Sequence, residues 1–412
     1  MVTSRLDLGL SDPVAYTCNC VANDEGGGLV LLFYRYFQNS PQLPGPTPTH
    51  DRIAELAEWQ EQLTSRLSIT GKIRVAEEGF NVTVGGRKGA IQEYMSTCLN
   101  HWSFKGLPLS TDDERQAFFK PSPGCACVFQ PSTKTNVKTC SEITPLGITD
   151  YTPKDWDSVE ELLPAEFHRR CYDQGTSLMD LRNHYESRIG YFVSPINSEI
   201  AERPQIRRFS QWPRFVKAQQ ARNKQSEQLL TYCTGGIRCE KATRWMAERP
   251  DEDRKICTLK GGIAAYLTWV EGEVSCGRMR TEESLFKGKN YVFDARGSIG
   301  LSDERQDIVA QCHMCGCSED RLSKCRSPGC HLVLVICSIC ENKDPRCCKN
   351  CREMASVNNG ILTRGNRTVC DCEKSREATL WSTEVPKPAR TQDWRKRVKQ
   401  QEHIDINVKI IS

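Results

Sequence analysis

The stretch that most constrains this chain is Leu229–Met246, which reads LLTYCTGGIRCEKATRWM. Its apolar start, through Tyr232, predicts a buried strand, and the helix-forming residues after Cys239 predict a helix. A strand that runs through a short glycine-containing loop into a helix brings several backbone N–H groups to one point. The helix dipole adds partial positive charge there. We therefore predict that Cys233, at the mouth of this loop, has a lowered pKa and reacts as a thiolate.

The other residues around the loop are assigned by their chemistry. Arg238 is a candidate for holding an oxyanion or a substrate phosphate, unless a salt bridge to Asp180 or Glu240 engages it. Asp180 ends a predicted strand and is expected to brace the loop, and Cys239 either resolves an oxidised Cys233 or packs beneath the helix. The predicted catalytic residues are Cys233 and Arg238, and the predicted loop and substrate-binding residues are Thr234, Gly235, Gly236, Ile237, Cys239, Asp180 and Arg182.

Strands and helices alternate on both sides of this loop. The predicted strands are Ser177–Leu181, Leu229–Tyr232 and Lys255–Leu259, and the predicted helices are Ser158–Cys171, Arg207–Lys224 and Ile263–Glu271. Such alternation predicts an α/β domain with a parallel sheet and helices on both sides. In such sheets the ligand site lies beyond the carboxyl ends of the strands, which is where Cys233 is expected.

The preceding segment has a different order. The predicted strands are residues 29–37, Gly71–Val75, Phe80–Val84 and a last one near Ala117–Phe119 or beyond, with helices at Asp51–Leu67 and Arg87–Leu99. The order β-α-β-β-α-β predicts an α+β ferredoxin-like (acylphosphatase-like) domain over residues 29–145. Residues 1–28 are expected to be a flexible leader, and Ser122–Ser141, rich in turn formers, an irregular insertion.

Cysteines are concentrated towards the end of the chain, where 12 of the 23 lie between Cys312 and Cys372. In a reducing compartment such a cluster predicts metal ligands rather than disulfides. Three Cys-x-x-Cys pairs and two further cysteines give the predicted ligands Cys312, Cys315, Cys325, Cys330, Cys337, Cys340, Cys348 and Cys351. Eight thiolates predict two structural zinc ions in tetrahedral sites, with an iron–sulfur cluster as the alternative.

The sequence does not reveal how these ligands are shared between ions. His331 is a possible substitute ligand, and Cys317, Cys347, Cys370 and Cys372 are left as spare cysteines.

Charge and hydropathy restrict the compartment and the partners. Basic residues exceed acidic ones between residues 276 and 412, including a basic polar tail at 373–412. This pattern favours a polyanion such as nucleic acid, although a solvated surface would have the same composition. No apolar run approaches the roughly 20 residues that a membrane span needs. The N-terminus does not resemble a signal peptide. We therefore expect a cytoplasmic protein without a membrane partner, with an organelle address left open.

Three motifs together resemble the rhodanese domain: the Cys233 loop, Asp180-Leu181-Arg182, and Leu259-Lys260-Gly261-Gly262. Four residues separate Cys233 from Arg238, whereas tyrosine-phosphatase-like loops have five. The longer runs YCTGGIRCEKAT, MDLRNHYES, FKGKNYVFDAR and CHMCG…CHLVLVICSIC resemble the rhodanese-type tRNA uridine hydroxylase family. The stretch 190–195 departs from the pattern that typical rhodaneses carry after their acidic helix.

This resemblance covers roughly residues 29–352. It implies oxygen-dependent 5-hydroxylation of the wobble uridine, with Cys233 as the essential residue, molecular oxygen as co-substrate and tRNA rather than DNA as the partner. Thiosulfate or persulfide sulfur transfer is the alternative, and a non-catalytic RNA-binding protein of rhodanese fold is a second. The expected parts are a rhodanese domain at 158–276 and a cysteine-rich zinc-binding module at 286–372, followed by the tail. The sequence does not indicate an oligomeric state.

Overall fold

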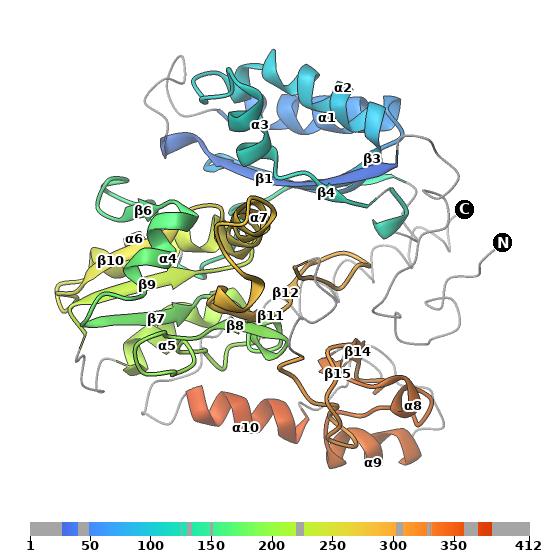
Figure 1. The fold of residues 1–412 in the computed structure, drawn as a ribbon. Helices are drawn as coiled ribbons and strands as arrows, with labels where there is room; N and C mark the ends of the chain where they lie inside the picture. The colour runs from blue at the N-terminus through green and yellow to red at the C-terminus, as the bar shows by residue number, and fades with distance from the viewer. Residues whose placement is uncertain are drawn as a thin grey trace, which may run out of the picture.

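The structure is a computed structural model, and its elements form three regions in chain order (Figure 1). It describes residues 27–39, 49–124, 126–129, 134–148, 151–219, 226–301, 308–327, 330, 332–357 and 370–380. Most of the predicted leader, the tail after residue 380 and His331 lie outside the described residues. Within the described ranges, we find no helix that is long and apolar enough to cross a membrane.

The first region is a five-stranded sheet with the strand order β4-β1-β3-β2-β5. Its strands are β1 (Gly28–Tyr36), β2 (Thr70–Ala76), β3 (Gly79–Arg87), β4 (Ser122–Pro123) and β5 (Thr135–Thr139), and its helices are α1 (His50–Arg66), α2 (Lys88–Leu99) and α3 (Asp112–Phe119). Strand β1 pairs antiparallel with β3 and β4, and β2 pairs antiparallel with β3. The order of elements expected for this region is therefore present, and β5 extends the sheet in parallel with β2.

Two expectations for this region need correction. Residues 117–119 form the end of α3, because the Thr111 and Glu114 side chains and backbones make a capping box that starts a helix there, and the expected strand lies just beyond them, at β4. Strand β5 lies in the segment predicted to be an irregular insertion. Its edge position, paired with β2 alone, allowed a polar sequence that carries little strand signal.

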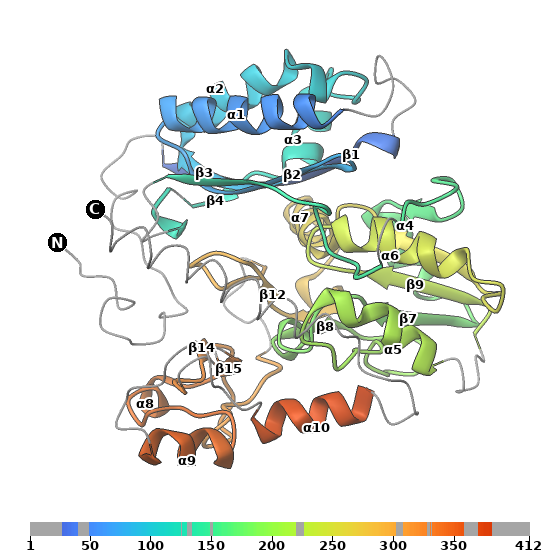
Figure 2. The ribbon, with the colours of Figure 1, turned by 180° about the vertical axis from the view of Figure 1, so that it is seen from behind.

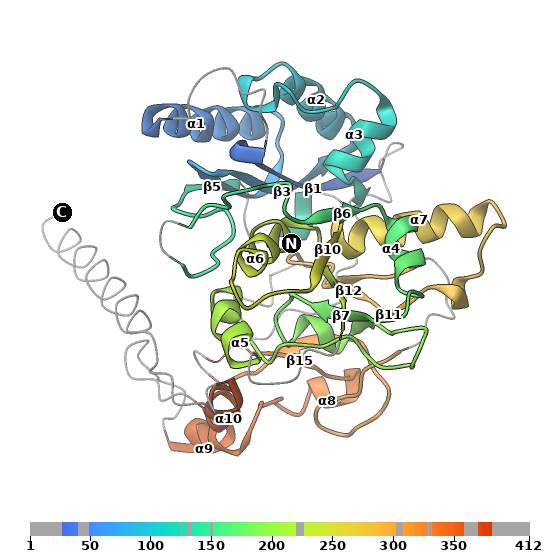
Figure 3. The same cartoon turned by 90° about the vertical axis from the view of Figure 1, so that its left-hand side faces the viewer.

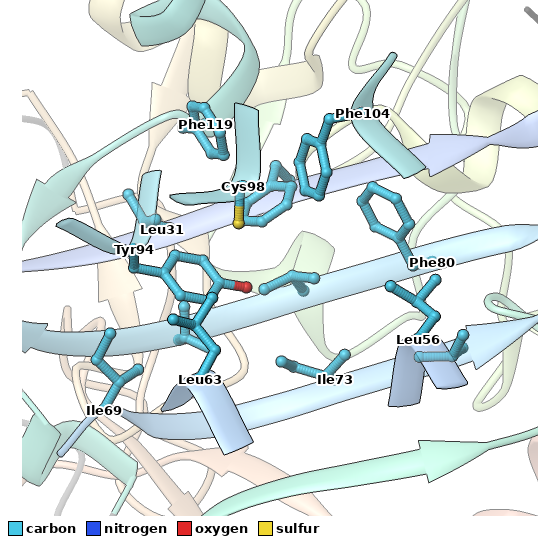
Figure 4. Packing of buried hydrophobic residues seen from close by; sticks show 14 of the residues in the cluster. Leu31, Leu56, Leu63, Ile69, Ile73, Phe80, Tyr94, Cys98, Phe104 and Phe119 are labelled. Carbon is cyan, nitrogen blue, oxygen red and sulfur yellow. The ribbon is translucent and has the colours of Figure 1, made fainter. Parts of the chain in front are cut away.

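Both faces of this sheet are covered. Helices α1 and α2 lie across one face (Figures 1 and 2), and the main hydrophobic core fills the space between them and the sheet (Figure 4). Leu31 and Phe33 of β1 belong to that core. Tyr34 and Tyr36 alternate with them and contact the second region instead. Burial on both faces explains why residues 29–37 show no alternation of polar and apolar residues.

The second region is a four-stranded parallel sheet with the order β6-β10-β9-β7. Its strands are β6 (Glu160–Leu162), β7 (Thr176–Asp180), β9 (Gln228–Tyr232) and β10 (Lys255–Leu259), and its helices are α4 (Pro164–Arg170), α5 (Trp212–Gln219), α6 (Ile237–Ala247) and α7 (Gly262–Ser275). Helices α5 and α6 pack in one hydrophobic cluster and α4 and α7 in another, on opposite faces of the sheet (Figure 3). This is the arrangement predicted from the alternation of strands and helices.

Two helix predictions in the second region need correction. Ser158–Cys171 divides into β6 and α4, because Pro164 at the first turn of α4 fixes a helix start there. Arg207–Lys224 contains a 3-10 turn at Phe209–Gln211 followed by α5, and residues 220–225 lie outside the description.

The third region is built from small two-stranded sheets and short helices. The sheets pair β8 (Gly190–Phe192) with β11 (Phe286–Gly288), β12 (Asn290–Tyr291) with β13 (Ser298–Ile299), and β14 (Leu322–Lys324) with β15 (Val333–Val335), and the helices are α8 (Ser338–Glu341), α9 (Lys349–Val357) and α10 (Asp371–Leu380). Because β8 comes from the second region, its pairing with β11 ties the two together. Helix α10 lies along α5 (Figures 1 and 2), and the core of this region consists largely of cysteines.

Candidate active site and cysteine clusters

Cys233 lies where the sequence analysis places it, directly between β9 and α6. It is fully buried, with none of its surface exposed. The backbone N–H of Gly236 donates a hydrogen bond to its Sγ over 3.2 Å, and the N–H groups of Arg238 and Cys239 also interact with the sulfur. The loop therefore surrounds one sulfur atom with backbone donors at a helix start, which is an anion-binding arrangement.

Two glycines, Gly236 and Gly262, make this close packing possible. Gly236, at φ +100°, caps α6, and a Cβ there would lie 2.6 Å from the Tyr34 hydroxyl. A Cβ on Gly262 would lie 2.5 Å from the carbonyl oxygen of Cys233. The start of α7 in turn holds the loop, since the N–H of Ile263 donates to the Cys233 carbonyl over 2.9 Å. The loop is thus fixed from both sides without a side chain between the two backbones.

Burial opposes the charged form of Cys233, but the surrounding donors outweigh it. The Cys239 thiol, the Arg238 guanidinium and the loop amides together lower the pKa of Cys233 from 9.0 to about 5. Burial and the neighbouring thiolate raise the pKa of Cys239 well above its usual range, so Cys239 stays a neutral thiol donor. The predicted lowering of the Cys233 pKa agrees with this geometry, and both cysteines lie in contact at the site.

Arg238 is positioned by a carboxylate that the sequence analysis did not single out. Its two terminal nitrogens donate to the two carboxylate oxygens of Glu186, each over 2.7 Å, and one also donates to Thr234 over 2.9 Å. Neither Asp180 nor Glu240 is its partner. Both groups are buried, and the guanidinium lowers the pKa of Glu186 despite the opposing effect of burial. Arg238 thus places a fixed positive charge beside Cys233, already engaged by Glu186.

Asp180 and Arg182 are bound to each other rather than open to a substrate. Both side chains are fully buried, and the Arg182 guanidinium meets the Asp180 carboxylate at 2.6 Å. Arg182 also donates to the carbonyl oxygen of Gly190 over 2.6 Å. A buried ion pair therefore fixes Arg182 at the β7–β8 connection, and its predicted role in substrate binding stays a prediction.

The first region covers the Cys233 loop. Tyr34 of β1 donates to the Glu240 carboxylate over 3.0 Å, and the Lys120 ammonium lies 5.3 Å from the centre of the Tyr34 ring. Burial lowers the pKa of Lys120 to about 8, although the charges of Glu240 and Cys233 partly oppose this shift. No sequence pattern links Tyr34 and Lys120 to the loop, because they lie more than 100 positions from it and share no motif with it.

The third region also reaches this loop. Asn290 of β12 donates to the carbonyl oxygen of Thr234 over 3.4 Å. The Phe293 ring, 47% exposed, lies 5.8 Å from the Arg238 guanidinium and 5.1 Å from Tyr291. Tyr185 contacts the other side of Tyr291, with ring centres 5.4 Å apart. A partly exposed aromatic group therefore adjoins the buried loop.

The cysteines of the third region form groups in which four sulfurs lie within 4.8 Å of one another. These groups are Cys312, Cys315, Cys317 and Cys337; Cys325, Cys330, Cys347 and Cys351; and Cys347, Cys348, Cys351 and Cys370. Cys340 lies against the first group, in contact with the thiols of Cys312 and Cys315. Each group could hold a metal ion. Three of the cysteines left as spares, Cys317, Cys347 and Cys370, belong to them, because folding rather than sequence spacing decides which sulfurs meet.

These cysteines have the sulfur spacing that a metal ion requires. A tetrahedral zinc site with zinc–sulfur bonds of roughly 2.3 Å has sulfurs about 3.8 Å apart. The Sγ atoms of Cys315 and Cys337 are 3.7 Å apart, as are those of Cys330 and Cys347. Backbone N–H groups donate to Cys312 and to Cys325, each over 3.4 Å. The donor set therefore fits a metal that prefers thiolates, such as zinc.

Comparison with known proteins places two family models on the chain. A "UPF0176 acylphosphatase like domain" matches residues 29–123, and a "Rhodanase C-terminal" domain matches residues 287–352. The first covers most of the five-stranded sheet, and the second covers the cysteine-rich region.

Proteins of similar sequence span most of the chain. It is 30% identical over 322 residues to a protein of Leptospira interrogans named tRNA uridine(34) hydroxylase, covering 77% of this chain and 75% of that one. A protein of the same name from Cronobacter sakazakii is 30% identical over 334 residues, covering 79% and 82%. The Arabidopsis thaliana "Rhodanese-like domain-containing protein 6" is 31% identical over 335 residues, covering 79% of this chain and 52% of that protein.

Proposed function

We propose that this chain, which belongs to the tRNA uridine(34) hydroxylase family, is a cytoplasmic rhodanese-domain enzyme that hydroxylates C5 of the wobble uridine in tRNA. The observation that carries this proposal is the amide-lined loop that holds Cys233 as a thiolate, with a pKa of about 5. At neutral pH such a sulfur is ionised and able to attack an electrophilic carbon.

In the proposed reaction, the Cys233 sulfur forms a bond to C6 of the uracil ring. The electron pair of the C5–C6 double bond then moves towards C5 and the C4 carbonyl, and C5 becomes nucleophilic. Oxygenation of C5, loss of its proton and departure of the sulfur from C6 restore the double bond and the thiolate. With molecular oxygen as co-substrate, one oxygen atom enters C5 and the other leaves as water, which requires two electrons from an external reductant.

Residues from the first and third regions could stabilise the developing negative charge and bind the extruded base. The Lys120 ammonium is near the loop and could stabilise the negative charge that develops on the C4 oxygen. Phe293 and Tyr291 could stack on a base or its neighbour as the wobble nucleotide leaves the anticodon stack. Arg238 and Glu186 would act as positioning residues, because their charges are already paired.

We propose zinc as the metal of the cysteine clusters, with a structural role. The clusters have thiolate donors only, and such closed sites stabilise a fold rather than activate water. Ile189 packs against Ala310, Leu322 and Val335 of the third region. It directly follows the turn that carries Glu186. Metal binding would therefore support Arg238 through this contact.

The test is nucleoside mass spectrometry of tRNA from cells that lack the protein and are complemented with variants. We expect the wild-type chain to restore 5-hydroxyuridine, Cys233→Ser to restore none, and Cys276→Ser, which changes an exposed cysteine, to match the wild type. Restoration of 5-hydroxyuridine by Cys233→Ser would overturn the proposal.

Sulfur transfer is a second candidate, because a loop of backbone donors would also stabilise a persulfide on Cys233. Purified protein separates the two reactions. Transfer of sulfur from thiosulfate to cyanide, together with an unchanged tRNA nucleoside profile in deleted cells, would favour sulfur transfer over hydroxylation. A protein inactive in both assays that still binds tRNA would support the non-catalytic alternative.

A further inference from the structure

The cysteines around Cys347 are packed in a way that one metal ion does not explain. In a tetrahedral site each ligand sulfur has three ligand neighbours. The Cys347 sulfur has four others within 3.8 Å: Cys351 at 3.4 Å, Cys330 at 3.7 Å, and Cys348 and Cys370 at 3.8 Å. Cys325 lies in the same group as well. A sulfur with so many neighbours belongs to more than one tetrahedron.

The membership of the groups leads to the same conclusion. The group of Cys325, Cys330, Cys347 and Cys351 and the group of Cys347, Cys348, Cys351 and Cys370 share two sulfurs, those of Cys347 and Cys351. We propose that these six cysteines hold a binuclear metal cluster, in which Cys347 and Cys351 bridge two zinc ions. Cys325 and Cys330 complete one ion, and Cys348 and Cys370 complete the other.

Distances within the cluster fit this arrangement. The separations of Cys347 from Cys330, Cys348 and Cys370 match the roughly 3.8 Å edge of a tetrahedral zinc–thiolate site. The edge between the two bridging sulfurs is shorter, 3.4 Å. Two like-charged ions repel each other across a shared edge, and the bridging sulfurs screen them by drawing together. A short edge alone would not suffice, because Cys315 and Cys317 are also 3.4 Å apart.

Charge and burial also favour shared ligands. All four sulfurs of the group containing Cys325 are buried, whereas Cys315 and Cys317 in the other cluster are exposed. Buried negative charge is costly. Six thiolates around two divalent ions leave a net charge of −2, half of what two separate four-thiolate sites would carry. Sharing therefore suits the buried cluster.

The binuclear cluster lies against the catalytic domain. Arg207 of the second region donates to the carbonyl oxygen of Cys330 over 2.6 Å. Cys370 directly precedes α10, which contacts α5 of the parallel sheet. Because Cys370 joins α10 to the cluster, the second zinc ion would fix this helix onto the second region. The proposal concerns metal content and does not depend on the reaction at Cys233.

Native mass spectrometry of the full-length chain, purified reduced and loaded with zinc alone, counts the ions directly. We expect three zinc ions per wild-type chain: two in this cluster and one in the cluster of Cys312 and Cys315. Cys347→Ser should lose two ions at once, its neighbour Cys348→Ser should lose one, and Cys276→Ser should keep three. Two ions in the wild type, or the loss of only one from Cys347→Ser, would overturn the proposal.

A second measurement on the wild-type protein does not depend on whether the variants fold. Two zinc ions that share a 3.4 Å sulfur edge, with zinc–sulfur bonds of roughly 2.3 Å, are about 3.1 Å apart. X-ray absorption spectroscopy at the zinc edge should show a zinc scatterer at that distance. A spectrum that contains sulfur scatterers alone, or protein purified with iron and acid-labile sulfide in this cluster, would contradict the binuclear zinc assignment.

Discussion

The Cys233 loop and the cysteine clusters use the same side chain in opposite surroundings. Around Cys233, backbone N–H groups and the Arg238 guanidinium stabilise a single sulfur anion. Among the described carboxylates, only that of Glu186 contacts Arg238. In the clusters, sulfurs face mainly one another. Protein donors can stabilise one buried thiolate, but several thiolates in contact repel and need a cation between them. The groups around a cysteine therefore decide whether it is suited to act as a nucleophile or as a metal ligand.

Metal removal should have the largest effect, and it should unfold the cysteine-rich region while leaving the parallel sheet of the second region folded. Structural zinc sites contribute roughly 10 kcal/mol or more of folding free energy. A strong chelator should therefore abolish the amide hydrogen-exchange protection of residues 310–357, while β9 and β10 stay protected. Hydrogen exchange followed by mass spectrometry measures both. If residues 310–357 kept their protection without metal, the clusters would be a core of neutral thiols.

Replacement of Cys233 should abolish the activity and leave the metal clusters intact. Cys233→Ser removes the nucleophile, and removal of a catalytic nucleophile lowers the rate by about 1000-fold or more. We expect this loss in 5-hydroxyuridine formation on purified tRNA, with zinc content equal to that of the wild type. Cys276→Ser is the matched control, because it removes an exposed thiol outside the loop and the clusters. A lower zinc content in Cys233→Ser would contradict the separation of Cys233 from the metal-binding cysteines.

Loss of the buried ion pair tests how the loop holds its charge. Glu186→Gln leaves the Arg238 guanidinium buried without a carboxylate, and breaking such a pair costs about 3–5 kcal/mol. Chemical denaturation should report this loss. The control is Glu93→Gln, which removes an exposed pair with Arg66 and should change stability by less than about 1 kcal/mol. Equal losses of stability in the two variants would show that burial does not make the Glu186–Arg238 pair contribute more than an exposed pair.

The ionisation of Cys233 should be visible in a pH titration. Its folded-state pKa of about 5 lies below the value of 9.0 for an unperturbed cysteine. The thiolate therefore adds stability that is complete above pH 9 and is lost as the pH falls towards 5. Burial raises the pKa of Cys257 to about 11, so its ionisation has the opposite sign. The titration of thiolate absorbance should therefore contain a step near pH 5 in the wild type that is missing from Cys233→Ser.

The cover supplied by the first region should have the smallest effect. Tyr34→Phe removes one hydrogen bond to Glu240, which corresponds to about 1 kcal/mol, or roughly a fivefold change in rate.

Lys120→Met should reduce hydroxylation more, because it removes the ammonium proposed to face the uracil oxygen. Both variants should retain the zinc content of the wild type. Kinetics on tRNA separate the two effects, and a fully active Lys120→Met would exclude the role proposed for that lysine.

Local patterns sufficed where neighbouring residues carry all the information. The strand, the two-glycine loop and the helix around Cys233 were predictable, because their geometry depends on a few adjacent residues. The order of elements along the first region was predictable up to β4. Patterns failed at α3, where a capping box outweighed the apolar end of the helix, and at β5, whose edge position required no apolar sequence.

The sequence alone determined the strand–loop–helix turn around Cys233 and predicted an activated cysteine there, together with a cysteine-rich region suited to metal. Only the tertiary structure decided which groups surround each sulfur. In the folded chain, Arg238 forms an ion pair with Glu186, and Arg182 forms a buried ion pair with Asp180. Tyr34 and Lys120, from a distant part of the sequence, lie over the loop. Folding also placed Cys347 between two groups of thiols. The physical reason is that residue type fixes what a side chain can do, whereas its charge and partners depend on contacts that span the whole fold.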